Sequence, residues 1–254
     1  MQQSEPQTRL QEEVERQRTL LAMITHDLKS PMVAILTATQ DLLQPSQIID
    51  MNPESVDHLK LIHAASSEVL ELIGNILAMA RLEAGKERIE PIRIDNLSSI
   101  LKSITDTFRY EAHVKDIHIV TEIDENLPDV YWDESKIHYH VINNIISNAL
   151  KHTPAGGEVR VRAGVEGAYI AIRILDNGPG VSMLERKRIF NRFENMEIKS
   201  LHDSKLAGLG LYNAHLFIRK HNGRITISDG LGGKGTCFTI MLPPHPYYQE
   251  NMPE

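Results

Sequence analysis

The chain has 254 residues, a formal net charge of −7 at pH 7, and 41% hydrophobic but only 5% aromatic residues. This length is enough for one large domain or for two smaller domains that each have a core. The acidic balance argues against nucleic acid as the main partner, because phosphate backbones select basic surfaces. The single cysteine, Cys237, cannot form an internal disulfide, and its apolar neighbours predict a buried hydrophobic residue rather than a reactive thiol.

The sequence itself predicts no membrane span. It contains no run of about 18 apolar residues, and its first twenty residues are too rich in charged side chains for a signal peptide. We therefore expect either a soluble protein or the cytoplasmic part of a longer one.

The first 85 residues have a helical pattern. One heptad frame places apolar residues at a and d positions, namely Leu10, Val14, Leu21, Ile24, Leu28, Ile35 and Leu42, with Gln17, Pro31 and Ala38 filling the remaining ones. After a connection at 44–53 that contains two prolines, a second helix is predicted by Leu59, Ile62, Val69, Ile73, Ile76 and Ala80. One such hairpin cannot cover both of its apolar stripes, so we expect two chains to form a four-helix bundle.

The remainder of the chain mixes helices with strands. Strands are predicted at 92–94, 117–123, 157–163, 168–175, 224–228 and 236–242, and helices at 95–115, 134–151 and 209–221. This order predicts an α+β layer of mostly antiparallel sheet under helices. We place an entry helix at 1–20 that continues into the bundle, a dimerisation domain at 8–85, a second domain at 88–243 and a tail at 244–254.

Four short motifs in the second domain point to an anionic ligand with a metal. The first, at 143–154, places Asn144, Asn148 and Lys151 on one helical face, where amide oxygens suit Mg²⁺ and the lysine suits a phosphate. The second, D-N-G-P-G at 176–180, follows an apolar strand, so its carboxylate can accept a hydrogen bond from an exocyclic amine.

The third motif, G-L-G-L at 208–211, opens a helix whose free N–H groups suit an anion. The fourth, G-G-K-G-T at 232–236, precedes the last strand. Each motif also has an ordinary explanation, such as a turn or a solvent-facing asparagine, but the four together in this order favour a binding site.

The four motifs closely resemble the N, G1, G2 and G3 boxes of the Bergerat-fold ATPase domain of histidine kinases, a fold shared with type II topoisomerases, Hsp90 and MutL-type proteins. The resemblance implies that Asn148 holds Mg²⁺ with help from Asn144, that Lys151 contacts phosphate, and that Asp176 binds the adenine amino group. It further implies ATP contacts from the glycine-rich boxes at Gly178, Gly180, Gly208, Leu209, Gly210 and Thr236.

Residues 181–207 correspond in that resemblance to a lid over the triphosphate. Within it, R-I-F-N-R-F at 188–193 is similar to the F box, which makes Arg192 a candidate phosphate or transfer contact. The chain departs from the family at Leu206, where the G2 box usually has its first glycine, and at His152, where an aromatic residue is common. An imidazole at 152 can still stack on a nucleotide.

The candidate acceptor of a phosphoryl group is His26. In the heptad frame of the first helix it falls at f, a position that points away from the bundle seam. The adjacent Asp27 can orient the imidazole and accept its proton, and Pro31 is expected to kink the helix beside it. Most single helical histidines have no such role, and the i, i+2 spacing of His138 and His140 does not favour a metal site.

The stretch T-H-D-L-K-S-P at 25–31 resembles the H box of the HisKA dimerisation domains. The combined resemblance implies two domains: an all-α antiparallel hairpin that forms a four-helix bundle in the dimer, and an α+β sandwich of the Bergerat ATPase type. By this resemblance His26 is phosphorylated, Asp27 assists, and Ser30 stands where a Thr or Asn supports dephosphorylation of the partner.

The activity implied is ATP- and Mg²⁺-dependent autophosphorylation on histidine, followed by transfer to an aspartate of a response-regulator receiver, in a cytoplasmic homodimer that binds no nucleic acid. Any membrane attachment would come from segments upstream of this sequence. Two alternatives stay open: a degenerate kinase that acts as a regulatory scaffold, which Leu206 favours, and a net phosphatase of the response regulator. The stimulus, the particular partner and the choice between cis and trans phosphorylation cannot be deduced from the sequence.

Overall fold

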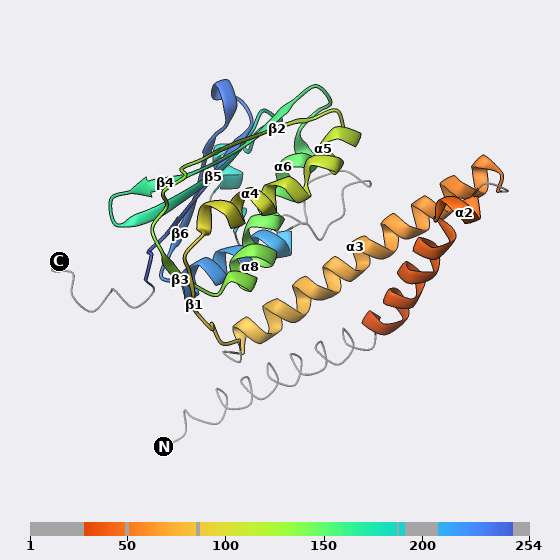
Figure 1. Ribbon diagram of the computed structural model, residues 1–254, viewed down its shortest axis with the longest axis horizontal. Helices are drawn as coiled ribbons and strands as arrows, with labels where there is room; N and C mark the ends of the chain where they lie inside the picture. Colours follow the sequence, from red (N-terminus) through yellow and green to blue (C-terminus); the bar gives the residue numbers. More distant parts are fainter. Residues whose placement is uncertain (1–27, 49–50, 85–86, 187, 191–207, 246–254) are drawn as a thin grey trace, which may run out of the picture. The chain divides into compact units, whose positions relative to one another are not determined.

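The computed structural model describes residues 28–48, 51–84, 87–186, 188–190 and 208–245 (Figure 1). The chain divides into two compact units, Met1–Arg88 and Ile89–Glu254, here called unit 1 and unit 2. Unit 1 is helical in its described part, and unit 2 combines a sheet with helices.

Unit 1 contains a helix over 28–42, the short helix α2 (Pro45–Ile48) and the long helix α3 (Pro53–Glu83). Both prolines of the predicted connection begin helices, because proline needs no hydrogen bond for its missing N–H at the first helical position. The start of α3 is fixed by Asn52, whose Oδ1 accepts a hydrogen bond of 2.7 Å from the backbone N–H of Ser55. The connection at 44–53 therefore contains a short helix that the sequence analysis did not predict.

A polar contact joins the two arms of the hairpin. Thr39 is buried, and its Oγ1 lies 3.1 Å from Nδ1 of His63 on α3. The Thr39 hydroxyl can donate to the carbonyl of Ile35 at 2.9 Å, so His63 can supply the proton of the contact between the helices. This contact opposes sliding of one helix along the other.

Apolar side chains remain exposed on both arms of the hairpin. Leu28, Ile35 and Leu42, spaced by seven residues, are exposed on the first helix, as are Leu61, Ile62 and Val69 on α3. Within the described part of the chain, one helical stretch, Pro53–Leu82, is long and apolar enough to cross a membrane by length and composition. The core helix of a soluble bundle has the same properties, so this observation is weak evidence for a span.

Unit 2 is built on a five-stranded sheet with the order β2-β4-β5-β7-β6. The strands are β2 (His118–Ile123), β4 (Glu158–Glu166), β5 (Tyr169–Asp176), β6 (Arg224–Asp229) and β7 (Thr236–Leu242). Only the pair β2–β4 is parallel, and the other three neighbouring pairs are antiparallel. The sheet is therefore mostly antiparallel, as predicted.

Helices cover one face of this sheet (Figure 1). They are α4 (Leu97–Thr107), α5 (Arg109–Val114), α6 (Asn143–His152) and α8 (Gly208–Lys220). A wider helical stretch, η1 (Lys136–Ile142), leads directly into α6, and a single turn, α7 (Met183–Arg186), follows β5. Along β4, Val159, Val161 and Ala163 are buried, while Arg160 and Arg162 between them are not. This alternation is what a sheet with one covered face requires.

The predicted helix at 95–115 is wrong as one continuous element, because it breaks at Phe108. The hydroxyl of Thr107 donates to the carbonyl of Ile104 at 2.7 Å, the group that a regular helix offers to the N–H of Phe108. Phe108 instead donates to the carbonyl of Thr105 at 3.1 Å, and α5 starts again at Arg109.

A second, two-stranded sheet was also not predicted. It pairs β1 (Ile92–Ile94) with β3 (Val130–Trp132) in antiparallel fashion. The residues that follow β7 are fixed to β3, since Trp132 Nε1 donates to the carbonyl of Pro243 at 2.8 Å and Tyr131 N–H donates to that of Pro244 at 2.7 Å.

The residue after α8, His221, is fully buried. Its Nδ1 lies 2.8 Å from the carbonyl oxygen of Phe217, which can only accept, so Nδ1 carries the proton. Its Nε2 accepts a hydrogen bond of 3.0 Å from the backbone N–H of Asp133. The contact at Nε2 requires the neutral imidazole, because a protonated ring has no acceptor nitrogen. Burial lowers the pKa of His221, although the Phe217 carbonyl and the Asp133 carboxylate oppose this shift.

Unit 2 is expected to lose stability as the pH falls from 7.5 to 5.5. A histidine whose pKa is lower in the folded state binds more protons when unfolded, so its contribution disappears below the unfolded pKa of about 6.5. Thermal melts across this range should show a falling Tm, and His221→Gln should flatten the curve. An equally steep curve in that variant would assign the effect to other histidines, such as His138 and His215, whose pKa values burial also lowers.

Candidate functional site

The centre of the candidate site is Asp176, the last residue of β5. It is only 3% exposed, and its Oδ1 accepts hydrogen bonds from the backbone N–H groups of Gly178 at 2.8 Å and Thr236 at 3.1 Å. The other carboxylate oxygen, Oδ2, takes part in neither bond. A buried carboxylate held by one oxygen leaves the other for an N–H donor of a ligand, such as an adenine amino group.

The charge of Asp176 is destabilising for the folded chain. Burial raises the pKa of this carboxyl, against the hydrogen bonds from Gly178 and Thr236 and the nearby His152, which lower it. A buried ionisable group whose pKa is shifted in this way is a common sign of a functional site.

Three glycines let the backbone close around Asp176. A Cβ on Gly230 or on Gly235 would lie 2.2 Å from the Asp176 carbonyl oxygen, and one on Gly178 would lie 2.6 Å from the carbonyl oxygen of His152. Gly235 also has φ +70°, a conformation that favours glycine. The second and fourth motifs therefore touch each other, and the second also touches the C-terminal end of α6. Gly230 lies just before the fourth motif and was missed by the sequence analysis.

The first and third motifs meet on the helices. On α6, Asn148 Nδ2 donates to Asn144 Oδ1 at 3.1 Å, which confirms that the two amides share one face. A Cβ on Gly210 of α8 would lie 2.3 Å from Nδ2 of Asn144, so glycine at this position is what lets α8 approach the asparagines. The two amides and the first turn of α8 therefore lie at one place.

The remaining predicted residues of unit 2 lie close to these groups. Lys151 and His152 are exposed on the last turn of α6, and His152 is near enough to Asp176 to affect its pKa. Gly180 has φ +78°, and a Cβ there would lie 2.9 Å from the Gly235 carbonyl oxygen. Thr236 is buried beside Asp176, and Leu209 is buried in the first turn of α8, which begins at Gly208.

Several predicted residues lie outside the described ranges. These are His26, Asp27, Arg192 and the departure at Leu206. Ser30 lies on the helix over 28–42 and is exposed.

Two polar residues, each within one of the motifs, make bonds that the sequence analysis did not predict. Asn177 Oδ1 accepts the backbone N–H of Glu158 at 2.9 Å, which joins the loop after β5 to the start of β4. Thr153 is buried, and its hydroxyl donates to the carbonyl of Ala149 at 2.7 Å, which closes the end of α6. Neither bond follows from a periodic pattern, so only the folded chain reveals them.

The start of the predicted lid is attached to unit 2 by aromatic contacts. Phe190 stacks on His215 of α8, with ring centroids 5.5 Å apart, and meets Phe238 of β7 edge-on at 6.3 Å. Just before it, α7 has a reciprocal cap, in which Ser182 N–H donates to Glu185 at 3.0 Å and Glu185 N–H donates to the Ser182 hydroxyl at 3.3 Å.

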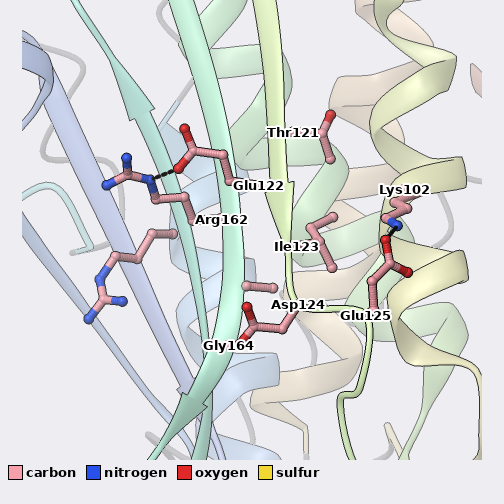
Figure 2. Close-up of a pocket in the computed structure, with 10 residues that line it drawn as sticks. Lys102, Thr121, Glu122, Ile123, Asp124, Glu125, Arg162 and Gly164 are labelled. Carbon is pink, nitrogen blue, oxygen red and sulfur yellow. Dashed lines mark hydrogen bonds and ion pairs between the residues drawn. The ribbon is translucent and has the colours of Figure 1, made fainter.

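A hollow of about 520 Å³ lies in a different part of unit 2, where β2 ends beside β4 (Figure 2). Four of its charged groups pair with each other, Lys102 with Glu125 at 2.5 Å and Arg162 with Glu122 at 2.5 Å. Gly164 lines this hollow, and Val159 lies opposite Asp176 in the pairing of β4 with β5. Five residues of β4 separate Gly164 from Val159, which corresponds to about 17 Å along the strand. This hollow is therefore separate from the Asp176 site.

The donor set at Asn144 and Asn148 fits Mg²⁺. Amide oxygens are hard, neutral ligands, and Mg²⁺ commonly takes its other ligands from water and substrate phosphates. Among the described residues there is no cluster of three or more His, Cys, Asp or Glu side chains that could hold a metal. A metal at the asparagines would therefore depend on oxygen atoms that the ligand and water supply.

Comparison with known families gives two matches. Residues 16–85 match the His Kinase A (phospho-acceptor) domain, and residues 133–246 match the family described as histidine kinase-, DNA gyrase B- and HSP90-like ATPase. The chain belongs to the histidine kinases.

Similar proteins agree with this assignment. The circadian input-output histidine kinase CikA of Synechococcus elongatus is 27% identical over 88% of this chain and 29% of its own length. The sensor protein kinase PmrB of Pseudomonas aeruginosa is 28% identical over 92% of this chain and 47% of its own length. The chain therefore spans less than half of these two relatives.

Solved structures show the same fold. The crystal structure of full-length ShkA in complex with AMPPNP has a TM-score of 0.66 and 24% identity, and covers 89% of this chain and 45% of that one. The Acinetobacter baumannii histidine kinase AdeS has a TM-score of 0.57 and 19% identity, over 86% of this chain and 98% of that one.

The variant Asp176→Asn should separate stability from nucleotide binding in this kinase. The oxygen of the new amide must still accept the N–H groups of Gly178 and Thr236. The amide nitrogen therefore takes the place of Oδ2, where it presents a donor to the adenine amine, which is also a donor. We expect ATP affinity to fall more than about ten-fold, while the Tm at pH 7.5 stays equal or rises, because a carboxyl with a raised pKa is destabilising above that pKa.

Calorimetric titration and thermal melts would measure both quantities for Asp176→Asn. The control is Asp106→Asn, an exposed residue of α4. Retained affinity in the Asp176 variant would show that this carboxylate does not contact the base.

The variant Gly210→Ala should weaken binding of Mg²⁺·ATP while the fold is retained. Its Cβ displaces the end of the Asn144 side chain rather than backbone, and alanine improves helix propensity by up to about 1 kcal/mol. We expect a several-fold loss of affinity with Mg²⁺ and a smaller loss without it. Gly74→Ala on α3 has open space around its Cβ and serves as the matched control. Equal affinities for the two variants would contradict the contact with Asn144.

Proposed function

We propose that this chain binds ATP with Mg²⁺ in unit 2, phosphorylates His26 of the hairpin, and passes the phosphoryl group to an aspartate of a response regulator. The observation that carries the proposal is the buried Asp176 carboxylate, enclosed by glycines beside the C-terminal end of α6, the helix that carries two asparagines on one face. The presence of both family domains in one chain adds support.

The proposed ATP site has one group for each part of the ligand. Asp176 Oδ2 accepts from the adenine amino group, Asn148 with Asn144 holds Mg²⁺, and Lys151 contacts a phosphate. Gly178, Gly180, Gly208, Leu209, Gly210 and Thr236 supply close backbone contacts, and His152 stacks on the nucleotide. Mg²⁺ would neutralise charge on the phosphates, which is its usual contribution to phosphoryl transfer. The related ShkA was crystallised with AMPPNP, an ATP analogue.

Transfer to His26 requires a displacement at the γ-phosphorus. An imidazole nitrogen forms the new P–N bond, the bond from the γ-phosphorus to the bridging oxygen breaks, and ADP leaves. Asp27 accepts the proton that the imidazole loses, and Arg192 contacts the transferring group. Positioning and charge neutralisation supply most of the catalysis in such reactions.

The working form is proposed to be a cytoplasmic dimer. The exposed Leu28, Ile35 and Leu42 repeat every seven residues, which is the spacing of a helix–helix seam. The receiver domain of the response regulator would bind near His26, where Ser30 can position water for dephosphorylation. The chain is proposed to bind no nucleic acid.

The test is incubation of the chain with γ-labelled ATP and Mg²⁺, beside His26→Ala. We expect an acid-labile, alkali-stable label on the wild type and none on His26→Ala, because phosphohistidine is stable to base and not to acid. His58→Ala, at an exposed position of α3, is the control and should keep its label.

Other outcomes of this labelling experiment separate the alternatives. Label on both wild type and His26→Ala would assign the acceptor to another histidine. No label on a dimeric wild type would favour the scaffold or the phosphatase, and decay of a phosphorylated receiver with added ADP would distinguish these two.

A further inference from the structure

Asp133, the residue between β3 and the helix that leads to α6, joins three segments of unit 2. Its carboxylate is buried and accepts a hydrogen bond of 2.7 Å from the Ser135 hydroxyl and one of 3.2 Å from the Lys136 N–H, which fixes the start of η1. It also accepts the N–H of Glu90 at 3.1 Å. Burial raises the pKa of this carboxyl, but these hydrogen bonds outweigh burial and lower it overall.

Glu90 lies in the segment through which the chain passes from unit 1 into unit 2. Unit 1 ends at Arg88, and residues 87–91 form neither helix nor strand before β1 begins at Ile92. The hydrogen bond from Glu90 to Asp133 is thus a contact of the arriving segment with the core of unit 2.

The backbone of Asp133 makes the third connection. Its N–H donates to Nε2 of the buried His221, which follows the last turn of α8. Because the ring nitrogens bond to a fixed acceptor and a fixed donor, the imidazole cannot rotate without breaking one of the two bonds.

Asp133 precedes η1 and α6, and His221 follows α8. The same helices, α6 and α8, also contact each other at the proposed nucleotide site. Gly210 at the start of α8 packs against Asn144 of α6, and between the two ends His140 stacks on Phe217 with ring centroids 4.7 Å apart. Gly210 lies at one end of α8 and His221 follows its other end, about 16 Å away along the same helix. A displacement at the His221 end is therefore carried to the asparagines.

We propose that His221 and Asp133 are positioning residues of the nucleotide site, and that they couple the segment arriving from unit 1 to the asparagines that hold Mg²⁺·ATP. This proposal rests on the proposed ATP site. Neither residue contacts the ligand in it: they set the distance between α6 and α8, and errors of about 1 Å in such a distance are enough to weaken catalysis.

A pair of substitutions at His221 tests the hydrogen bond itself. Gln can place an oxygen near the position of Nε2 and accept the Asp133 N–H, whereas Asn is too short to reach it. In the full chain, well below the Tm, we expect His221→Asn to weaken the Kd for Mg²⁺·ATP about ten-fold, the order expected when a buried N–H loses its acceptor. His221→Gln should stay within about two-fold of the wild type by the same reasoning.

A purely structural role would give another result. Both variants would then lower the Tm and leave the Kd of the folded protein unchanged, which would overturn the proposal. Equal weakening by Asn and Gln would also overturn it, because the bond to Asp133 would then not matter.

The coupling to the arriving segment is tested at Glu90. Glu90→Pro removes the N–H that Asp133 accepts, and Glu90→Ala keeps it, so the two variants differ in this donor. Residue 90 precedes Pro91 and is therefore already restricted to extended conformations. We expect a several-fold weaker Kd and slower autophosphorylation for the proline variant alone. Equal values for the two variants would overturn the coupling, and this pair also decides the case if His221→Asn does not fold.

Failure of the ATP site can be distinguished from failure of this proposal. If the wild type binds no ATP, the proposed function fails, but amide hydrogen exchange of the nucleotide-free chain still reports on the helices. His221→Asn should then speed exchange in 143–152 and 209–213 relative to His221→Gln. Unchanged exchange in both regions would overturn the positioning role without reference to ATP.

Discussion

The burial of one carboxyl group, that of Asp176, organises the part of unit 2 that forms the candidate site. Burying Asp176 raises its pKa, so the charged form costs free energy that hydrogen bonds from Gly178 and Thr236 only partly offset. Those N–H groups belong to two loops far apart in the chain, and they reach the same oxygen because Gly230 and Gly235 have no side chain to hold the backbones apart. The sheet brings these residues together, because β5 ends at Asp176 and its neighbour β7 begins at Thr236.

The helices solve a second problem, which is to bring neutral ligands to the same place. Asn144 and Asn148 are held one turn apart by their own hydrogen bond, and Gly210 allows α8 to close against them. This contact depends on the far end of α8, where His221 meets Asp133. Site geometry and domain stability are therefore set by the same buried bonds, which is why the pH dependence of folding and the precision of the site are linked.

Much of this arrangement could be predicted from the sequence, because it leaves periodic or compositional traces. The alternation along β4 and the spacing of Asn144, Asn148 and Lys151 each follow from local geometry, and the ordered glycine motifs predict the candidate site. The hydrogen bond between Asp133 and His221 spans 88 residues and leaves no such trace. The break at Phe108 depends on a single threonine hydroxyl, which does not alter the periodic pattern of the sequence.

The ion pairs on the outer face of the sheet contrast with Asp176, the carboxylate that we propose as a ligand group. There Arg160 pairs with Glu122 at 3.0 Å and with Glu158 at 2.6 Å, and Arg173 pairs with Glu166. Such partly exposed pairs contribute little to stability, because water screens them, and they leave little net charge for a partner. Asp176 takes its two hydrogen bonds from neutral backbone groups, so its negative charge is not cancelled by them. Asp176, the most buried carboxylate among the described residues, uses one oxygen for both of these bonds, and in the proposed site its other oxygen accepts from the ligand.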